Sequence, residues 1–498
     1  MKIILTLALL LFGMQAAGAA DQCQKTACVN VYTDNNEIII EAHKGNSKVK
    51  KTITQAPKKA AVKVAPKPKA VPLFFPPTAV CFPASTQEVS AIMQRCYEHN
   101  VPVFTRGAGT GLSGACLPVS AGLVLSTKKL NRIVDIDVKN LTVTTETGVV
   151  NGVLKAAVEA VGLYYPPDPA SQGSCSIGGN LAHGAGGPRA VKYGITRDYV
   201  LNLEVVLPNG DVIWTGANTL KNSTGFSLTH LMVGSEGMLG IITQAVLKLI
   251  PKPTQELLLV ASFANLHDCA SAVNAVLLSK YKPCAIELME KSGVEISMVA
   301  TQSTFPTHPE AEAYLLFAFD GFDGDDLFLQ AEGIFGILDT YNALDILPSP
   351  NADTANAWWK VRRAIGETVK QVSPYKEEDT VVPRSAMPGL LLKVKEIGGK
   401  YGFQSVCYGH AGDGNLHVNI LRNNLSDSQW TVEIPKAIVE IFEYCKSVGG
   451  TISGEHGIGL VQAPYLSIVM GESHYQLFRG IKATFDPKGL LNPGKWLD

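Results

Sequence analysis

The sequence predicts an α+β protein with two large domains. Its 498 residues exceed what one hydrophobic core usually organises, so two or three domains are expected. Strand-like and helix-like patterns alternate along the chain, and the alternation restarts after Pro251 and Pro253. Hydrophobic residues make up 46% and charged residues 17%, which is typical of a globular protein. The net charge of -1 offers no electrostatic case for binding nucleic acid.

The first 20 residues resemble an export signal. Lys2 supplies a positive start, residues 3–12 a short apolar core, and residues 16–20 a cleavage zone of small residues. The apolar core is shorter than the ~20 residues that a membrane-spanning helix needs. We therefore expect export to the periplasm or cell envelope, with an uncleaved membrane anchor as the alternative.

Residues 21–71 are predicted to form a small appendage followed by a linker. One strand-like run occupies Glu37–Glu41. Beyond it, prolines are mixed with lysines that have no acidic residue among them, which predicts a semi-extended linker. These lysines are Lys48, Lys50, Lys51, Lys58, Lys59, Lys63, Lys67 and Lys69. The linker is expected to be a solvated tether, or alternatively to associate with an anionic membrane surface at ~1 kcal/mol per lysine.

The cysteines argue against two classes of cofactor site. There are ten, and none falls in a CxxC motif, which disfavours a cysteine zinc site and an iron–sulfur cluster. Cys23 and Cys28 are close enough along the chain to form a disulfide in an oxidising compartment. The other eight are expected to be buried as small apolar residues.

The first domain, expected over residues 72–253, combines short helices with strands. Ser85 and Glu88 form a capping box at the start of an amphipathic helix, and Gly162 ends a second helix. Turn residues 208–211 join two strands in a hairpin. Predicted strands cover 101–104, 123–126, 141–145, 201–207, 212–214 and 241–249, and the second helix covers 151–161.

The second domain, expected over residues 254–498, repeats the alternation of strands and helices. Predicted strands cover 257–263, 285–289 and 313–319, and predicted helices cover 266–280 and 326–338. This order implies a second sheet with one face covered by helices.

In the first domain, a glycine-rich loop follows the predicted strand 101–104. Gly109, Gly111 and Gly114 match the dinucleotide motif GxGxxG, but that motif must open an amphipathic helix, whereas here residues 115–118 and then a strand follow. The loop is therefore expected to be a nest of backbone N–H groups that face phosphates, with a purely structural loop as the alternative. Two further glycine-rich segments, 166–189 and 234–243, can lie flat against a planar ligand. Three such segments imply one long ligand.

The second domain carries the clearest candidate site. His410 and His417 flank a turn rich in glycine, and Glu455 and His456 follow downstream. The turn predicts that the two histidines lie at adjoining strand ends. Two imidazoles and a carboxylate suit a borderline divalent metal, and the second imidazole beside Glu455 suits a base. The alternative is a polar loop with two hydrogen-bonded histidines.

The three glycine-rich segments of the first domain, together with residues 192–198, resemble the FAD-binding domain of the vanillyl-alcohol oxidase type. The stretches 410–419, 453–459 and 485–494 resemble the C-terminal domain of the FAD-linked D-2-hydroxyacid dehydrogenases, and the resemblance covers residues 72–498. That family includes the glycolate oxidase catalytic subunit, D-lactate dehydrogenase and D-2-hydroxyglutarate dehydrogenase. It implies a two-part FAD-binding domain and a C-terminal α+β cap domain with a ferredoxin-like antiparallel sheet.

The resemblance implies non-covalent FAD, because no histidine occupies the loop where related covalent flavoenzymes attach it. Residues of the first loop would hold the pyrophosphate: Arg106, Gly107, Gly109, Thr110, Gly111, Ser113 and Gly114. The second segment would line the flavin through Pro167, Asp168, Gly178, Gly179, Asn180 and Gly184. The third would line the far end of the cofactor through Glu236, Gly237 and Ile242.

The resemblance also implies the catalytic set. His410, His417 and Glu455 would hold a divalent metal, usually zinc, while Asn419 and His456 face the substrate. Arg362 would clamp the substrate carboxylate, with Arg363 as the alternative. Gly366 and the acids of residues 376–379 stand where enzymes for dicarboxylates carry other polar residues and a lysine. This difference favours a small monocarboxylate over 2-hydroxyglutarate.

The expected function is oxidation of D-lactate or glycolate to the 2-oxo acid, with His456 taking the hydroxyl proton and a hydride passing to the flavin. An exported enzyme has no access to cytoplasmic NAD, so a quinone, a cytochrome or an electron-transfer subunit is the expected acceptor. One alternative is another oxidase or dehydrogenase of the same flavin superfamily, acting on a sugar-type alcohol or 2-hydroxyglutarate. Another is a non-catalytic scaffold of the cell envelope.

Overall fold

The computed structural model describes residues 28–34, 37–44, 47–54 and 76–497, and the chain forms two compact units, 1–55 and 56–498. The first unit is an antiparallel sheet in the order β1 (Cys28–Asp34), β2 (Glu37–Lys44) and β3 (Ser47–Thr54). The sequence predicted one strand here and a linker from Lys48. That prediction was wrong, because residues 47–54 pair along the whole of β2 and satisfy their backbone hydrogen bonds there. The predicted export signal, Cys23 and the proline-rich part of the linker lie outside the described residues.

The second unit begins with a three-stranded parallel sheet, in the order β4 (Ala79–Cys81), β6 (Leu123–Ser126) and β5 (Val103–Arg106). Helix α2 (Thr86–His99) packs Val89 and Met93 against it. Its predicted cap is present, since Ser85 Oγ accepts the N–H of Glu88 at 3.2 Å. No helix occurs between β5 and β6 among the described residues, which confirms that the glycine loop is not of the Rossmann type.

A five-stranded antiparallel sheet follows. Its order is β11 (Val212–Trp214), β10 (Val200–Val206), β12 (Ile241–Lys248), β8 (Thr142–Glu146) and β7 (Ile133–Asp137). The predicted hairpin is confirmed as β10 and β11. The helices of this part are α3 (Asn151–Glu159), α4 (Ile177–His183), α5 (Ala190–Tyr193) and α6 (Leu228–Met232), and β9 (Leu163–Tyr164) pairs with β13 (Ile250–Pro251).

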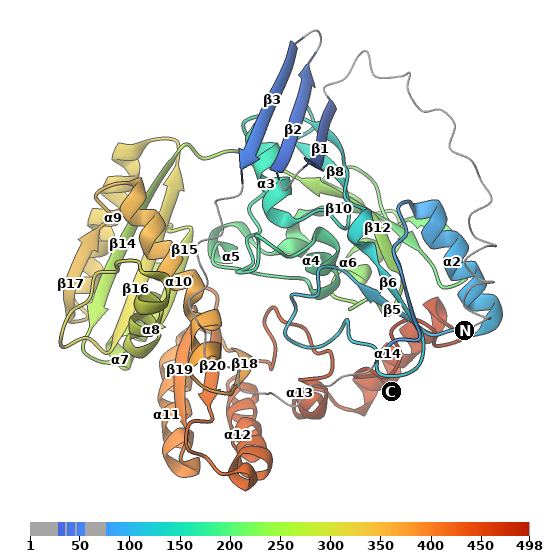
Figure 1. Cartoon of the computed structure of the whole chain (residues 1–498). Coiled ribbons are helices and arrows are strands. Elements are labelled where there is room, and N and C mark those ends of the chain that lie inside the picture. Colours follow the sequence, from blue (N-terminus) through green and yellow to red (C-terminus); the bar gives the residue numbers. More distant parts are fainter. Residues whose placement is uncertain (1–27, 35–36, 45–46, 55–75, 498) are drawn as a thin grey trace. The chain divides into compact units, whose positions relative to one another are not determined.

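The chain then builds a seven-stranded sheet in which all neighbouring strands are antiparallel (Figure 1). Its order is β17 (Ala343–Pro348), β14 (Gln255–Phe263), β16 (Ala313–Gly321), β15 (Ala285–Glu290), β19 (Gln404–His410), β20 (Asn415–Leu421) and β18 (Tyr375–Val381). Strands β19, β20 and β18 sit together with α11 (Met387–Tyr401) and α12 (Ile434–Ser447) (Figure 1).

Helices pack on both faces of this sheet. Helices α7 (Leu266–Leu278), α9 (Gly324–Asp339), α11 and α12 bury one face, while α8 (Lys291–Thr301) and α10 (Ala352–Val372) pack on part of the other. The sequence predicted a single covered face, which was wrong. Strand neighbours such as Leu258 and Leu259 point to opposite faces and are both buried, so each face needs its own cover.

The C-terminal segment carries α13 (Leu466–Val469) and α14 (Glu472–Phe485) and then returns to the first part of the unit. Leu491 bridges Val103 and packs with Val89 and Met93, although the sequence placed it in the second domain. Among the described helices, none combines the length and the apolar character that crossing a membrane requires.

Candidate active site

The alternation of side chains along the strands gathers the site on one face of the seven-stranded sheet. Glu287 pairs with His410, Tyr408 with His417, Asp379 with His417, and Glu377 with Asn419. Cross-strand partners share a face, so these polar side chains lie together. The residues between them, Ile286, Cys407, Leu416 and Val418, point to the other face and join its apolar core.

The predicted histidine turn is confirmed. His410 ends β19 and pairs with Asn415, which begins β20, so a four-residue turn joins the strands. Gly414 has φ +88°, and a Cβ there would lie 2.1 Å from the carbonyl oxygen of Val382. A side chain is therefore excluded at this point both by backbone conformation and by space.

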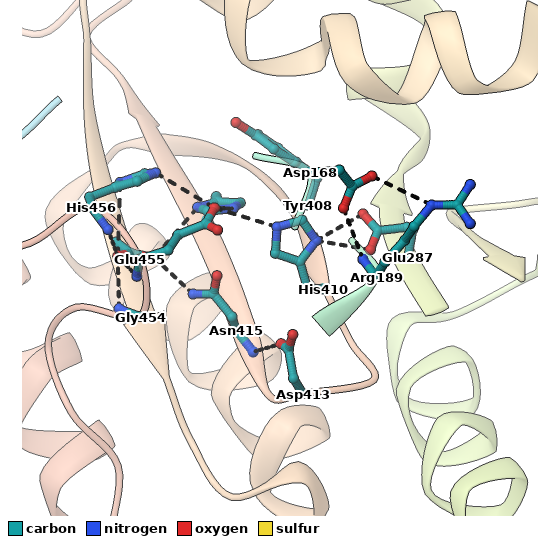
Figure 2. A network of polar contacts seen from close by, with 12 residues as sticks. Asp168, Arg189, Glu287, Tyr408, His410, Asp413, Asn415, Gly454, Glu455 and His456 are labelled. Atoms are coloured by element: carbon teal, nitrogen blue, oxygen red, sulfur yellow. Dashed lines mark hydrogen bonds and ion pairs between the residues drawn. The ribbon is translucent and has the colours of Figure 1, made fainter. Parts of the chain in front are cut away.

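Figure 2 shows how His410 and Glu455 converge. The Nε2 atoms of His410 and His417 lie 3.4 and 3.5 Å from Glu455 Oε1, and the donor atoms of the three residues lie within 4.8 Å of one another. On its other side, His410 Nδ1 lies 2.9 Å from Glu287 Oε1, an interaction that orients the ring and leaves Nε2 for a ligand. This donor set fits a divalent cation such as zinc. A second group, Glu377, His417 and His456, meets the same distance criterion.

The charges of this cluster are strongly coupled. Burial opposes ionisation of Glu455, but the nearby His410 and His417 outweigh it and hold the pKa of that carboxyl well below its usual range. Burial likewise lowers the pKa of His410, and Glu287 and Glu455 raise it well above the ordinary value. Glu287 and Glu455 therefore favour a positive charge at His410. Either a proton or a metal ion can supply that charge.

Asp379 fixes the position of Glu455 and His456. Its Oδ2 accepts the backbone N–H groups of Gly454, Glu455 and His456 at 2.7, 2.8 and 2.9 Å, and the Ser453 hydroxyl at 3.0 Å. Burial works against the charge, yet His456, His417 and these hydrogen bonds lower the pKa of Asp379 to about 2. The sequence shows an acid here but no sign of the loop that it anchors.

His456 stacks on His417, with ring centroids 5.1 Å apart and planes at 14°. Its Nε2 lies 3.9 Å from Glu455 Oε1 and its Nδ1 lies 3.9 Å from Asp379 Oδ2. Burial lowers the pKa of His456, and Asp379, Glu377 and Glu455 together raise it above its ordinary value. His456 therefore sits beside the metal-ligand cluster with a carboxylate at each end of its ring.

Helix α10 supplies two arginines with different environments. Arg362 is buried, forms a close ion pair with Glu287, and lies over the Tyr408 ring, 4.9 Å from its centroid. Arg363 reaches instead to Asp168 in the first part of the unit, at 3.1 Å. Arg362 is therefore the arginine beside the histidine cluster. Arg363 links α10 to the first part of the 56–498 unit.

A cavity of about 450 Å³ runs from the glycine loops to the histidine cluster. His410, His417, Glu455, His456 and Arg362 line one end. The predicted cofactor residues that line it are Gly107, Gly109, Thr110, Gly111, Gly178, Gly179, Asn180, Glu236, Gly237 and Ile242. A second cavity of about 610 Å³, lined by Arg106, shares the walls Gly107, Ala108, Cys116, Ser174 and Ser176 with it. Together they form two adjoining spaces, walled in part by glycines, where the expected FAD would lie.

Several predicted cofactor residues have structural tasks and do not line either cavity. The carbonyl oxygens of Ser113 and Gly114 accept N–H groups of Leu460 and Leu117, and that of Pro167 accepts the Asn151 amide. Asp168 is 2% exposed and pairs with Arg189 (Figure 2) as well as with Arg363. Gly184 caps α4 with φ +67°. These residues hold the loops next to the cavity in place through contacts outside the cavity wall.

Asn419 and Glu236 also differ from expectation. Asn419 is fully buried, does not line the cavity, and neither atom of its amide group makes a hydrogen bond of good geometry with any described residue. Glu236 lines the cavity, but its carboxylate accepts the N–H groups of Ile458 and Gly459 at 2.6 and 2.9 Å. It therefore ties the loop after His456 to the cofactor-binding part.

The structure adds site residues that the sequence did not single out. His183 and Tyr408 line the cavity, and Glu287 lies behind His410. Burial is the main cause that lowers the pKa of His183. None of these residues has a sequence motif of its own, because each is brought to the site by strand pairing or loop packing.

Comparison with known proteins places this arrangement in a family. Residues 77–216 match the family described as FAD binding domain, and residues 252–496 match FAD linked oxidases, C-terminal domain. Glycolate oxidase subunit GlcD of Bacillus subtilis is 39% identical, over 84% of this chain and 88% of that protein. D-lactate dehydrogenase of Anaerostipes hadrus is 37% identical, over 82% and 87%.

A solved structure of p-cresol methylhydroxylase with substrate bound aligns with a TM-score of 0.70 at 18% identity, over 84% of this chain and 88% of that one. At this identity the likeness concerns the fold, and it confirms the predicted vanillyl-alcohol-oxidase-type architecture with its C-terminal cap. The chain therefore belongs to the family of FAD-linked oxidases that includes glycolate oxidase subunit GlcD and D-lactate dehydrogenase, and it is an FAD-linked oxidoreductase.

Proposed function

We propose that the protein oxidises a small D-2-hydroxy acid, D-lactate or glycolate, to the 2-oxo acid, with a divalent metal at His410, His417 and Glu455. The observation that carries this proposal is the cavity that joins the glycine loops to the histidine cluster. It connects the glycine loops proposed to hold the flavin with the three residues proposed to hold the metal. The names of the relatives support a 2-hydroxy acid as the substrate.

The chain's own residues divide the work of the proposed reaction. The glycine loops would hold FAD, which would accept the hydride, and His410, His417 and Glu455 would hold a metal, which would make the substrate hydroxyl more acidic. Arg362 is placed to hold the substrate carboxylate, and Glu287 keeps its guanidinium in position. His456 is placed to take the hydroxyl proton, because its ring borders the cavity beside Glu455. His410 and His417 are each only 4% exposed, whereas His456 and Glu455 are partly exposed to the cavity.

Further parts of the proposal concern the metal and the acceptor. Two imidazoles and one carboxylate favour zinc over the oxygen-seeking cations. A quinone, a cytochrome or an electron-transfer subunit would accept the electrons outside the cytoplasm. The export signal and the membrane association of the lysine-rich segment stay predictions, since residues 1–27 and 55–75 lie outside the described part.

The experiment is anaerobic reduction of the bound flavin by D- and L-2-hydroxy acids, with and without a chelator. D-lactate or glycolate is expected to bleach the flavin, and the chelator is expected to stop this until zinc is added back. His417→Ala is expected to lose the reaction, whereas the control His267→Ala, at an exposed site, keeps it. Bleaching that survives both the chelator and His417→Ala would indicate a metal-independent oxidase of the same superfamily. A colourless folded protein would indicate a scaffold.

A further inference from the structure

The last described residues of the chain, 486–497, form a strap that contacts the glycine loops of the first part of the unit. Asp486 shapes its start, because its Oδ2 accepts the N–H of Leu491 at 2.7 Å. Leu491 forms a parallel bridge with Val103 on β5, and the N–H of Asn492 donates to the carbonyl of Val103 at 2.7 Å. Strand β5 leads directly into the first glycine loop, so the strap is attached at the base of that loop.

Asn492 joins two of the glycine segments through one side-chain amide. Its Nδ2 donates to the carbonyl of Ala115 at 3.0 Å, directly after the first loop, and to the carbonyl of Glu236 at 2.7 Å, in the third segment. Both partners are acceptors, so the NH2 group must face them. Ala115 and Glu236 line the cavity, whereas Asn492 is 2% exposed and does not line it. Asn492 therefore fixes the separation of two parts of the cavity wall from outside the cavity.

Glu236 is the more constrained of the two partners. Its backbone has φ +52°, a left-handed conformation that residues other than glycine seldom adopt. Its carbonyl accepts Asn492, and its carboxylate accepts the N–H groups of Ile458 and Gly459. The next residue, Gly237, has φ +72° and lines the cavity as well. Surrounding contacts must hold such a backbone in place, and Asn492 supplies one of them.

Two lysines extend this connection to other carbonyls of the same loops. Lys495, 5% exposed, donates through Nζ to the carbonyl of Leu117 and lies 3.5 Å from that of Gly114. Lys482, on α14, donates to the carbonyl of Met238 at 2.8 Å. The C-terminal part of the chain thus holds the first and the third glycine segments at several points.

We propose that Asn492 is a positioning residue for the cofactor: by holding Ala115 and Glu236 at a fixed separation, it preorganises the FAD site and raises the affinity for FAD without touching it. Loops that are already ordered lose less conformational freedom when a ligand binds, so the ligand binds more tightly. Linkage makes the effect reciprocal, and bound FAD must stabilise the strap by the same free energy. This inference concerns the cofactor alone and does not depend on which acid the enzyme oxidises.

The first test measures the Kd of FAD for the full chain, by following flavin release from the diluted holoenzyme. In Asn492→Gly the amide is lost while glycine still adopts the φ of +47° without strain, so the backbone conformation is preserved. Loss of the two hydrogen bonds is expected to weaken FAD binding by at least ~10-fold. Asn492→Asp should weaken it further, because a carboxylate would then face two carbonyl oxygens.

The matched control is Asn423→Gly, after β20. Asn423 also has a left-handed backbone, with φ +40°, and its amide donates to Gln404 Oε1 at 2.8 Å. This change should leave the FAD affinity unchanged. The free energy of unfolding is measured for both variants, so that a general loss of stability is separated from a loss of FAD. If Asn492→Gly binds FAD as tightly as Asn423→Gly, Asn492 has a structural role alone and the inference is overturned.

The second test measures hydrogen exchange in the full chain, with saturating FAD and after FAD has been removed. FAD is expected to slow exchange at the N–H groups of Leu491 and Asn492, although neither residue lines either cavity. Strand β16 serves as the reference for global unfolding. The protection should be smaller in Asn492→Gly. Exchange in the strap that does not respond to FAD would contradict the reciprocal coupling and overturn the inference.

Discussion

The two faces of the seven-stranded sheet use the same strands for opposite purposes. Leu416 and Val418 point into an apolar core under α7, α9, α11 and α12, whereas His417, between them, points to the cavity. On β18, Glu377 points to the cavity, whereas the next residue, Glu378, points to the opposite face and accepts a hydrogen bond from Gln462. One face buries apolar surface throughout, whereas the other carries, beside its own apolar core under α8 and α10, charges whose mutual attraction is balanced against burial. Adjacent residues should therefore differ sharply in whether their loss affects stability or chemistry.

The largest effect is expected from His417→Ala on the polar face. If the residue is a metal ligand, its loss should lower kcat/KM by at least ~10³-fold, or ~4 kcal/mol, because metal-assisted charge stabilisation supplies several kcal/mol. The measurement is steady-state kinetics together with metal analysis of the purified protein. Retained metal with full activity would assign the cluster a purely structural role.

Leu416→Ala, one residue away on the apolar face, should do the reverse. Leu416 is fully buried, so its truncation should lower the free energy of unfolding by ~2–5 kcal/mol. Chemical denaturation measures this change, and the activity per folded molecule should be nearly unchanged. A loss of activity without a loss of stability would contradict the division between the faces.

Glu378 offers a test that depends on pH. Burial raises the pKa of this carboxyl from 4.5 to about 7, so the folded protein keeps a proton that the unfolded chain releases. Stability should fall as pH rises from 4.5 to about 7 and then level off. Glu378→Gln, which does not titrate, should be more stable than wild type above pH 7, by at most ~3 kcal/mol, and similar below pH 4.5. Unfolding curves of wild type and Glu378→Gln at pH 4.5 and 8 measure the difference. If the two proteins are equally stable at both pH values, Glu378 does not titrate with a raised pKa.

The smallest expected effect comes from Glu287→Gln, behind the metal-ligand cluster. Glu287 is fully buried and contacts His410 Nδ1 and Arg362. Removing its charge should weaken metal affinity by ~10–100-fold, as for other outer partners of metal-bound histidines. Competition with a chromogenic chelator measures the affinity. An unchanged affinity would show that the ring of His410 is held by packing alone.

Local patterns allowed much of the site to be predicted. The turn between His410 and His417 follows from glycine and asparagine, and the cap at Ser85 follows from a four-residue motif. Asp168 and Ser113 do not line the cavity although their neighbours do, because Asp168 pairs with Arg363 and the Ser113 carbonyl accepts the Leu460 N–H. A glycine-rich segment shows that a ligand approaches, but it does not show which of its residues face that ligand.

What local sequence settled is therefore the chemistry that neighbouring residues share: two histidines across a turn, a glutamate next to a histidine, and a first glycine loop with no helix behind it. Long-range packing settled the rest. Strand pairing put Glu377 and Asp379 beside His417, and the loop after Ser453 folded onto Asp379. Helix α10 turned Arg362 to the cluster and Arg363 to Asp168. These outcomes depend on contacts between residues tens to hundreds of positions apart, and such contacts form only when the whole core packs.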